Sequence, residues 1–477
     1  MNDDVRLERL LEDGLHDLAP ARAPNRLSTQ VMAETGEVRP RARWLALIKE
    51  PPMRTNSRLV AGSPTARAAA VMAATLLLVV MLATAGIAGS QILAAEGPII
   101  VDQSGNGHHE TIQAAVDAAE AGDEIAIRPG TYAEAVVIGK DVSVRGDGPR
   151  EAIVITAPQE GPTALVMLDR SYQDPYALLL MGTEASISGL TFRGESAGVI
   201  ASGGAPTLEN ILFDGTGITY DGTFGLPGGN SVIVNQGSAA VIRGNTFADG
   251  GPIGVFGASS PHILDNTLTG GPHIYGLGWA EGSVVGGNTI ESVVARGIGM
   301  FDSSEALLIE SNVFRDVGRI AIEVQAGEAT IIGNTIEGAG ADGISIRDKG
   351  SAELIEDNQV TDAGATGITV YLSEPVLRDN TIRNAKTGVS WGGDDGAIVG
   401  NVISDTGVGL LITRGSPDVR DNVVEGATNR GISISRDAAP ALTGNQTCSN
   451  GEGLFVAAEA AAVIDDTNVN CEGAPAE

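Results

Sequence analysis

A short pattern of polar and apolar positions recurs through most of the chain. An asparagine is followed two residues later by an apolar residue and then by a turn of Asp, Gly, Ser or Asn. A glycine and two apolar residues at alternate positions follow, as in Gly343-Ile344-Ser-Ile346. Alternation predicts strands, and a fixed period predicts a repeat architecture. The asparagines are spaced by 21 to 24 residues: Asn245, Asn266, Asn288, Asn312, Asn334, Asn358, Asn380, Asn401, Asn422, Asn445 and Asn468.

This repeat predicts an all-β fold, a right-handed parallel β-helix with three strands and three turns in each coil. Stacked coils lie about 4.8 Å apart, so roughly 16 coils over residues 96–477 would form a rod about 75 Å long. We expect the asparagines to form a structural ladder, with each amide donating to one neighbour and accepting from the other. Asparagine also tolerates left-handed backbone geometry, which a sharp recurrent turn requires.

A short capping helix is expected before the first coil. Residues 111–120 place Ile112, Ala115, Val116 and Ala119 on one helical stripe, which ends at Gly122-Asp123. Residues 124–138 then alternate in strand fashion around a turn at Pro129-Gly130. This opening resembles that of pectin-lyase-like β-helix proteins, and the resemblance extends over the rest of the chain. That superfamily contains polysaccharide lyases, esterases, hydrolases and many proteins that are not enzymes.

The stretch from Ala68 to Ala95 contains no charged residue and is long enough to span a bilayer. Glu96 and Asp102 follow it, and basic residues precede it: Arg39, Arg41, Arg43, Lys49, Arg54, Arg58 and Arg67. This asymmetry predicts a cytoplasmic N-terminus and a β-helix outside the cell membrane. The expected organisation is a cytoplasmic segment (1–65), a transmembrane helix (66–95) and the β-helix (96–477).

Two further points concern residues 1–95. A signal peptide is the alternative to an anchor if the true start lies near Met53, and Ala83-Thr-Ala85 would then be a cleavage site of a secreted protein. Residues 5–18 predict a short amphipathic helix, and residues 20–65 predict a tether. The layout resembles that of membrane-bound anti-sigma factors without their zinc-binding His/Cys motif, which implies a cytoplasmic protein partner for residues 1–65.

The acidic charge limits the choice of partners. The whole chain carries a net charge of −30, and residues 96–477 hold 19 Lys or Arg against 51 Asp or Glu, a net −32. Such a surface repels nucleic acid. A neutral, cationic or cation-bridged ligand is easier to accommodate, so a polysaccharide or another envelope component is the expected outer partner, with the lipid bilayer around residues 68–95.

The two cysteines lie in the last two repeats. Cys448 and Cys471 each follow a ladder asparagine by three residues, and stacking would place their Cα atoms about 4.8 Å apart, within disulfide range. The in-register side chains run nearly parallel, so the sequence leaves two alternatives open, a disulfide staple or two free thiols. An exported location favours the disulfide.

Catalytic templates of the superfamily find no complete match. The segment from Gly130 to Glu134 resembles the first motif of pectin methylesterases, but the later aspartate segments are missing. Asp394-Asp395 resembles the paired carboxylates of polygalacturonases. The repeat register places this pair in an ordinary turn row, and the accompanying Gly-His-Gly and Arg-Ile-Lys motifs are missing. The sequence therefore assigns no catalytic residue.

No cofactor is required and no metal is assigned. Carboxylates stacked along the same turn row could attract calcium, although a solvated acidic edge is the favoured explanation. Calcium-dependent lyases also need a basic residue, and Arg347, Arg414 and Arg436 end long strands. Copper is not expected, because the histidines form no ligand cluster: His108, His109, His262 and His273.

Breaks in the repeat are the best candidates for ligand binding, because inserted loops turn a uniform rod into a specific surface. Two insertions, at residues 169–176 and 215–229, carry aromatic and acidic side chains that suit sugars. With the strand-end Arg347, the candidate ligand-binding residues are Tyr172, Asp174, Tyr176, Tyr220, Asp221 and Phe224. Trp279 and Trp391 align with inward positions and are expected in the core.

Three functions remain open after this reading. The first is a membrane-anchored, non-catalytic module that binds polysaccharide or another envelope component. The second is a carbohydrate-active enzyme, either a polysaccharide lyase or a glycoside hydrolase. The third is a transmembrane sensor.

Overall fold

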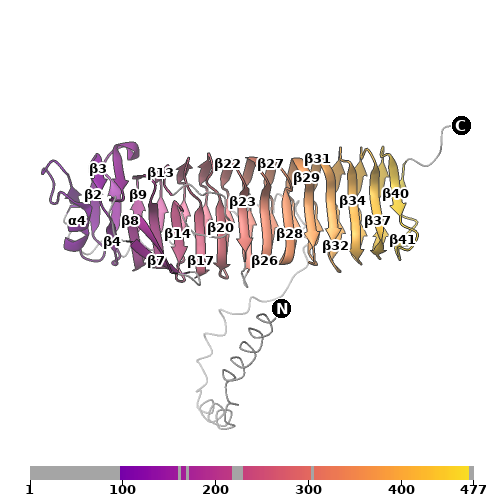
Figure 1. Cartoon of the computed structure of the whole chain (residues 1–477), viewed down its shortest axis with the longest axis horizontal. Helices are drawn as coiled ribbons and strands as arrows, with labels where there is room; N and C mark the ends of the chain where they lie inside the picture. Colours follow the sequence, from indigo (N-terminus) through magenta and orange to yellow (C-terminus); the bar gives the residue numbers. More distant parts are fainter. Residues whose placement is uncertain (1–96, 159–162, 168–170, 218–228, 302–305, 472–477) are drawn as a thin grey trace, which may run out of the picture. The chain divides into compact units, whose positions relative to one another are not determined.

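With one exception, each strand pairs in parallel with the matching strand of the next coil, so backbone hydrogen bonds run between coils. This pairing builds a parallel β-helix of about 15 turns, the fold expected from the repeat. The computed structural model describes residues 97–158, 163–167, 171–217, 229–301 and 306–471. Residues from Ala95 onward form one compact unit, in which Figure 1 shows the coils stacked in chain order from α4 to β41.

Three sheets run the length of this unit, and two of them flank the ladder asparagines. The pre-Asn sheet contains β1 (Ile99–Val101), β2 (Glu124–Ile127), β5 (Ser143–Gly146), β9 (Ser186–Ser188), β12 (Thr207–Glu209), β15 (Val241–Arg243), β18 (His262–Leu264), β21 (Ser283–Gly286), β24 (Ala306–Glu310), the ends of β26 (Ile320–Ile332) and β28 (Ile344–Glu356), β30 (Val376–Arg378), β32 (Ala397–Val399), β35 (Asp418–Arg420), β38 (Ala441–Thr443) and β41 (Val463–Ile464). The post-Asn sheet contains β3 (Gly130–Ala133), β6 (Ile153–Thr156), β10 (Thr191–Arg193), β13 (Leu212–Asp214), β16 (Thr246–Ala248), β19 (Thr267–Thr269), β22 (Thr289–Val293), β25 (Val313–Val317), β27 (Thr335–Ala339), the starts of β29 (Gln359–Tyr371) and β31 (Thr381–Gly392), β33 (Val402–Ser404), β36 (Val423–Glu425), β39 (Gln446–Cys448) and β42 (Val469–Asn470).

The third sheet, here the long-strand sheet, closes each coil. It contains β4 (Val136–Ile138), the end of β8 (Ser171–Thr183), β11 (Ala197–Gly204), β14 (Val232–Asn235), β17 (Ile253–Ser259), β20 (Ile274–Trp279), β23 (Arg296–Phe301), the starts of β26 and β28, the ends of β29 and β31, β34 (Val408–Gly415), β37 (Arg430–Ala438) and β40 (Glu452–Val456). One antiparallel hairpin, β7 (Thr163–Met167) with the start of β8, and one 3-10 turn, η3 (Arg150–Ala152), complete the described elements.

Apolar side chains at alternate strand positions fill the interior of every coil and form one continuous core. In the post-Asn sheet, Phe192, Phe213 and Phe247 stack with ring centroids 5.5 and 4.5 Å apart. Trp279 and Trp391 are buried in this core, as expected from their alignment. The in-register stacking of like side chains brings close packing and dispersion attraction to every step of the helix.

The asparagines form the expected ladder. In Asn266, both the backbone N–H and the side-chain Nδ2 donate to Oδ1 of Asn288, at 3.0 and 2.9 Å. The same Nδ2 donates to the Ile242 carbonyl at 2.8 Å. This arrangement repeats from Asn245 to Asn445, with the side chains buried. Each amide thus satisfies backbone groups that would be costly to bury unpaired.

The left-handed backbone was expected at these asparagines, and this expectation is wrong. The residue with positive φ is the one before the asparagine, with φ between 53° and 66° at Gly244, Asp265, Gly287, Ser311, Gly333, Asp357, Asp379, Gly400, Asp421 and Gly444. Neighbouring residues therefore form the turn and the ladder. Gly, Asp and Ser take the strained conformation, and the buried asparagine supplies the hydrogen bonds.

The same division shows where the ladder begins. Asn210, which lies 35 residues before Asn245, has φ 51° and occupies the turn position. Ile211 holds the ladder position instead, because its backbone N–H donates to Oδ1 of Asn245 at 2.9 Å. The ladder therefore begins at Asn245.

The capping helix is present as α4 (Ile112–Ala118), with Thr111 at its N-cap. Ile112, Ala115 and Val116 are buried against the first coil. The Glu134 carboxylate accepts hydrogen bonds from the backbone N–H groups of Ile112 and Gln113 at 3.0 and 3.1 Å, which satisfies free donors at the helix start. Glu134 thus belongs to the cap, as does its buried neighbour in β3, Tyr132, whose hydroxyl donates to the Arg128 carbonyl at 2.9 Å.

At the other end, Cys448 and Cys471 form a disulfide with a Cα–Cα distance of 4.7 Å. It ties the end of β39 to the residue after β42. Of the two alternatives, the structure contains the paired form.

The expected transmembrane helix, amphipathic helix and tether all lie outside the described residues. Within the part of the chain that the structure describes, no helix is long and apolar enough to cross a membrane.

Candidate functional site

The long-strand sheet offers the widest outward surface of the β-helix. Its strands reach six residues or more in β20, β23 and β34, and alternation leaves two or three outward positions on each. In the middle coils these positions follow two lines across neighbouring strands. Row 1 contains Tyr275, Gly299, Glu323, Ser345 and Thr369, each paired with the next. Row 2 lies two residues further along each strand and contains Leu277, Phe301, Gln325, Arg347 and Tyr371. In row 2, Leu277 pairs with Phe301, and the last three residues each follow a paired residue of their strand. The register of β26 against β28 shifts directly after Val324, so row 2 is irregular at Gln325.

Towards the N-terminal end, the outward side of the same sheet is apolar and covered. A second hydrophobic cluster there contains Tyr176, Ala197, Ile200, Ile233 and Phe256, all of them buried. Burial raises the pKa of the Tyr176 hydroxyl. This part of the sheet is packed and presents no open surface at these residues.

The surface becomes polar at β23 and β26. The Arg296 guanidinium contacts the Glu323 carboxylate of the next coil, and the two side chains are only 14 % and 4 % exposed. Nε2 of Gln325 donates to Oε1 of the same carboxylate at 3.0 Å. Both oxygens of Glu323 are thus engaged, which is the condition under which a carboxylate tolerates burial.

A second arginine-carboxylate group lies one coil further on. Nη2 of Arg347 donates to Oδ2 of Asp342 at 2.6 Å, and Nε of Arg347 donates to Oγ of Ser345 at 2.6 Å. The Thr369 hydroxyl donates to the same Asp342 oxygen at 3.1 Å. Asp342 is only 6 % exposed, whereas Arg347 is 43 % exposed. The buried aspartate holds an arginine at the surface.

Two aromatic side chains of row 2 lie over glycines. A Cβ added at Gly299 would lie 2.6 Å from Cε2 of Phe301, and one at Gly392 would lie 3.0 Å from Cδ2 of Tyr371. Each ring therefore rests close to the backbone of the sheet. Tyr371 is exposed to 47 %, and Phe301 is half-buried beside Arg296, whose guanidinium carbon lies 5.3 Å from the ring centroid.

A histidine and a tyrosine mark the edge of this polar region. The rings of His273 and Tyr275 lie 5.6 Å apart, and Tyr275 meets Phe256 of the apolar cluster edge to face at 5.6 Å. Burial lowers the pKa of His273 to about 4, and the nearby Arg296 cation adds to this effect. The imidazole is therefore neutral at pH 7.

The family described as "right handed beta helix region" matches residues 176–332 and 321–469. These two matches cover most of the coils. The chain belongs to the right-handed β-helix family. No curated protein sequence matches it.

Solved structures of low sequence identity resemble the chain in fold. The catalytic unit of a GH87 α-1,3-glucanase from Streptomyces thermodiastaticus is 13 % identical over 79 % of this chain and 69 % of that chain, with a TM-score of 0.45. A PL6 alginate lyase in complex with a trisaccharide is 18 % identical over 80 % and 86 %, with a TM-score of 0.39. PfbA, a surface adhesin of Streptococcus pneumoniae, is 13 % identical over 72 % and 86 %, with a TM-score of 0.40.

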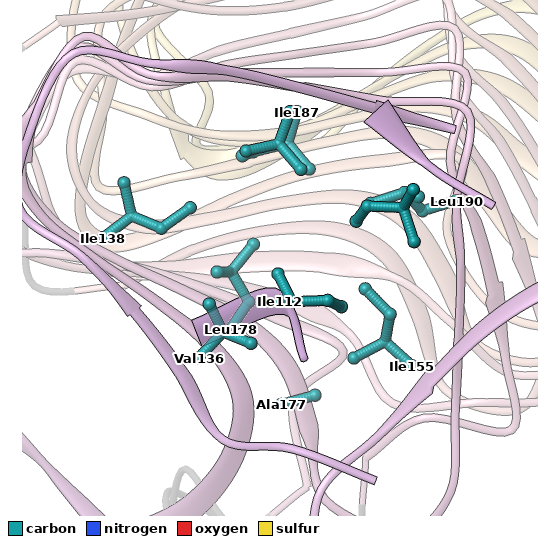
Figure 2. A pocket seen from close by; sticks show the side chains of 10 residues that line it. Ile112, Val136, Ile138, Ile155, Ala177, Leu178, Ile187 and Leu190 are labelled. Carbon is teal, nitrogen blue, oxygen red and sulfur yellow. The ribbon is translucent and has the colours of Figure 1, made fainter. Parts of the chain in front are cut away.

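The interior of this right-handed β-helix contains a small cavity beneath α4. Figure 2 shows that the side chains around it are apolar, among them Ile112, Val136 and Leu178. They belong to the core. With no polar group to orient a ligand, this space is a packing defect of the first coils.

The residues that the sequence singled out are not brought together in one place. Arg347 lies in row 2, as described above. Tyr176 is buried in the second hydrophobic cluster, so it presents no face to a sugar. Tyr172 and Asp174 lie in the β7–β8 hairpin, opposite Val166 and Ala164. Tyr220, Asp221 and Phe224 lie outside the described residues.

The acidic turn gives no site of its own. Asp394 contacts Arg414, and both side chains are exposed. Within the described part of the chain, no group of three or more His, Cys, Asp or Glu side chains could hold a metal ion.

Sequence reasoning missed Arg296, Glu323, Asp342 and Tyr371. A signal for Glu323 was present, because it is the one charged residue in the run Ile320-Ala-Ile-Glu-Val324. A charge inside such a run marks either a solvated outward position or a buried ion pair. Its partner Arg296 lies 27 residues earlier, and only the coil register brings the two together.

Proposed function

We propose that this protein binds a polysaccharide on the outward side of the long-strand sheet, between β23 and β29. The observation that carries the proposal is the sequence of side chains in row 2. The aromatic rings of Phe301 and Tyr371 lie on the first and last of four coils, and the amide of Gln325 and the guanidinium of Arg347 lie on the two coils between them. A sugar presents faces of C–H groups and a rim of hydroxyls. Aromatic rings suit the faces, and planar polar side chains suit the rim. Phe301, Gln325, Arg347 and Tyr371 supply both kinds of contact on four consecutive coils, each directly after a paired residue of its strand.

Binding without catalysis is favoured over a hydrolase or lyase. A catalytic acid or base must reach the atom that gains or loses a proton. Among the described side chains of rows 1 and 2 and their hydrogen-bond partners, the carboxylates are Glu323 and Asp342, and each is nearly inaccessible and held by an arginine. Their arrangement supports a positioning role, in which they fix Arg296 and Arg347 on the sheet.

We further propose that the module is anchored in the cell membrane by residues 68–95, with the N-terminus in the cytoplasm and the β-helix outside. The uncharged stretch and the basic residues before it support the span and its direction. The disulfide in the last coils supports export, because such bonds persist in oxidising compartments. Protease accessibility of the β-helix in intact cells tests this topology.

The binding proposal is tested with the full-length protein, solubilised in mild detergent and immobilised. It is incubated with a panel of neutral and acidic polysaccharides, with and without calcium, and both retention and new reducing or unsaturated ends are measured. Retention without new ends is expected. Release of new ends would show that the protein is an enzyme and not a binding module. Failure to retain any polysaccharide would refute the proposal.

The location of the site is tested with Tyr371→Ala and Arg347→Ala. Each removes a contact in row 2, and we expect about tenfold weaker binding from each, equivalent to about 1.4 kcal/mol. The matched control is Arg383→Ala, which removes an arginine of a more exposed ion pair, with Asp405, on the post-Asn sheet. Equal losses in Arg347→Ala and Arg383→Ala would place the ligand elsewhere.

A further inference from the structure

We infer that the last described coil of the β-helix binds an extended, basic segment of another protein, which adds further strands along β40 and β41. This interaction surface is separate from the proposed polysaccharide site, which lies between β23 and β29. Figure 1 shows α4 at one end of the stack of coils and β40 and β41 at the other. The two ends differ in how their core and their strand edges are covered.

The strands of the last coil pair along one edge only within the described residues. β40 pairs with β37, β41 with β38 and β42 with β39, whereas a middle strand such as β35 pairs on both sides, with β32 and β38. A strand edge without a partner presents backbone N–H and C=O groups to its surroundings. Another extended polypeptide matches this alternation of donors and acceptors, and peptides add to the edges of sheets in this way.

The hydrophobic core is open at the same end. Leu454 and Val456 of β40 are only partly buried, and Ile464 of β41 is 45 % exposed. The residues on which these three stack in the preceding coil are all buried, namely Ile432, Ile434 and Leu442. At the first coil, by contrast, α4 covers the core with buried apolar side chains. Apolar side chains of an added segment would remove the open end of the core from water, which favours binding.

The charge of the last coil indicates the chemistry of the segment. Residues 449–471 contain no Lys or Arg, and their acidic residues are Glu452, Glu459, Asp465 and Asp466. Glu452 contacts Arg430 of the preceding coil. The other three are exposed, and none of them lies in an ion pair with a described Lys or Arg. Lys or Arg side chains of a partner would complement this negative charge.

A second copy of this chain fits the surface less well than a basic partner does. Two last coils that met end to end would bring both sets of Glu459, Asp465 and Asp466 to one interface, where like charges repel. Head-to-tail stacking would require strands to add over α4, whose buried Ile112 and Val116 already cover that end. Charge complementarity therefore favours a basic segment of a different protein.

Two contacts keep this surface formed in the absence of a partner. An uncovered last coil tends to open locally, but the disulfide between Cys448 and Cys471 ties the residue after β42 to the end of β39. The guanidinium carbon of Arg430 lies 3.4 Å from the ring centroid of Phe455 in β40, which adds a second link between the last two coils. Because the strand edge is already ordered, less conformational entropy is lost when the segment binds.

The test uses the full-length protein in mild detergent and a synthetic peptide of alternating Val and Lys, as long as residues 452–464. The same peptide with Glu in place of Lys is the control. With the Lys peptide, amide hydrogen exchange in β40 and β41 should slow about tenfold or more, while exchange in β26 to β31 stays unchanged. The Glu peptide should give no protection. Binding of the Lys peptide should weaken between about 0.05 and about 0.5 M salt, because charge interactions are then screened.

Two matched substitutions show whether the strand edge itself binds the peptide. Val463→Lys places a positive charge on β41, at a side chain that is 67 % exposed, and should weaken binding of the Lys peptide about tenfold. Val402→Lys makes the same change at an exposed valine of the post-Asn sheet and should leave binding unchanged. Thermal unfolding of each variant shows that it is folded.

Three results would overturn the inference, and none of them bears on polysaccharide binding. The first is no protection by the Lys peptide. The second is equal binding to the two variants or protection spread over all coils, which would show a non-specific attraction to an acidic protein. The third is protection of β40 and β41 that rises with protein concentration in the absence of peptide, which would identify a second copy as the occupant.

Discussion

Arg296 and Glu323 form an ion pair between neighbouring coils, with the carboxylate 4 % and the guanidinium 14 % exposed. Removing the charge of one partner leaves the other without compensation in a poorly solvated place. We therefore expect Glu323→Gln to lower the free energy of unfolding by about 3 kcal/mol. Denaturant unfolding of the full-length protein at neutral pH measures this loss.

An exposed ion pair provides the matched control. Arg315 contacts Glu291 and Glu337 with all three side chains at least one third exposed, so Glu337→Gln should change the free energy of unfolding by less than about 0.5 kcal/mol. The double variant Arg296→Met with Glu323→Leu should recover most of the loss, because it leaves no unpaired charge. Equal effects of Glu323→Gln and Glu337→Gln would show that burial of the first pair is energetically unimportant.

The Asn ladder predicts a large penalty for a small change. Oδ1 of Asn358 accepts from both N–H and Nδ2 of Asn334 at 3.0 and 2.9 Å, and its Nδ2 donates to Asn380 and Ile331. Asn358→Ala leaves these buried groups unpaired and should cost about 3 kcal/mol. Asn358→Asp should cost more at pH 7, because a carboxylate would face the Asn380 and Ile331 oxygens.

Equilibrium unfolding in denaturant checks both ladder variants. Gln359→Ala changes the exposed next residue and should be close to neutral. An Asn358→Ala variant as stable as Gln359→Ala would mean that water replaces the ladder bonds at no cost.

The repeat made the fold predictable because a solenoid depends on neighbouring coils. The period of Asn245, Asn266 and later residues fixes which residues stack, so the three sheets, the inward tryptophans and the ladder followed from spacing alone. The backbone conformation did not follow from the spacing, because the spacing could not show whether Asn266 or Asp265 has the positive φ. That distinction depends on which side chain is buried.

The candidate site was less predictable, for a physical reason. Arg347 was noticed because it ends a strand, but Asp342 and Thr369, which hold and adjoin it, are ordinary residues in the sequence. The breaks in the repeat instead indicated the insertions, where Tyr176 is packed in an apolar cluster. An outward row of the sheet becomes visible only when four coils are placed in register.

The disulfide predicts a local effect at the C-terminal end. Cys448 and Cys471 are separated by 23 residues, and closing a loop of this length contributes about 3 kcal/mol through the entropy of the unfolded chain. Replacement of both by serine should therefore raise amide hydrogen exchange in β40 to β42 and leave β26 to β31 unchanged. Treatment of the natural protein with dithiothreitol should have the same effect. Unchanged exchange in the last coil would mean that strand pairing alone holds it.

His273 predicts a loss of stability on mild acidification. Its folded-state pKa is lowered to about 4 from an ordinary value of 6.5, chiefly by burial and further by Arg296. The folded state therefore favours the neutral imidazole. This contribution is complete above pH 6.5 and is lost as the pH falls towards 4, because the unfolded state binds the proton first. His273→Gln cannot take up this proton, so its melting temperature should fall less than that of the natural protein between pH 7 and pH 4.5. His262→Gln, at an exposed histidine, should follow the natural protein, and coincident pH profiles for all three would show that His273 keeps an ordinary pKa.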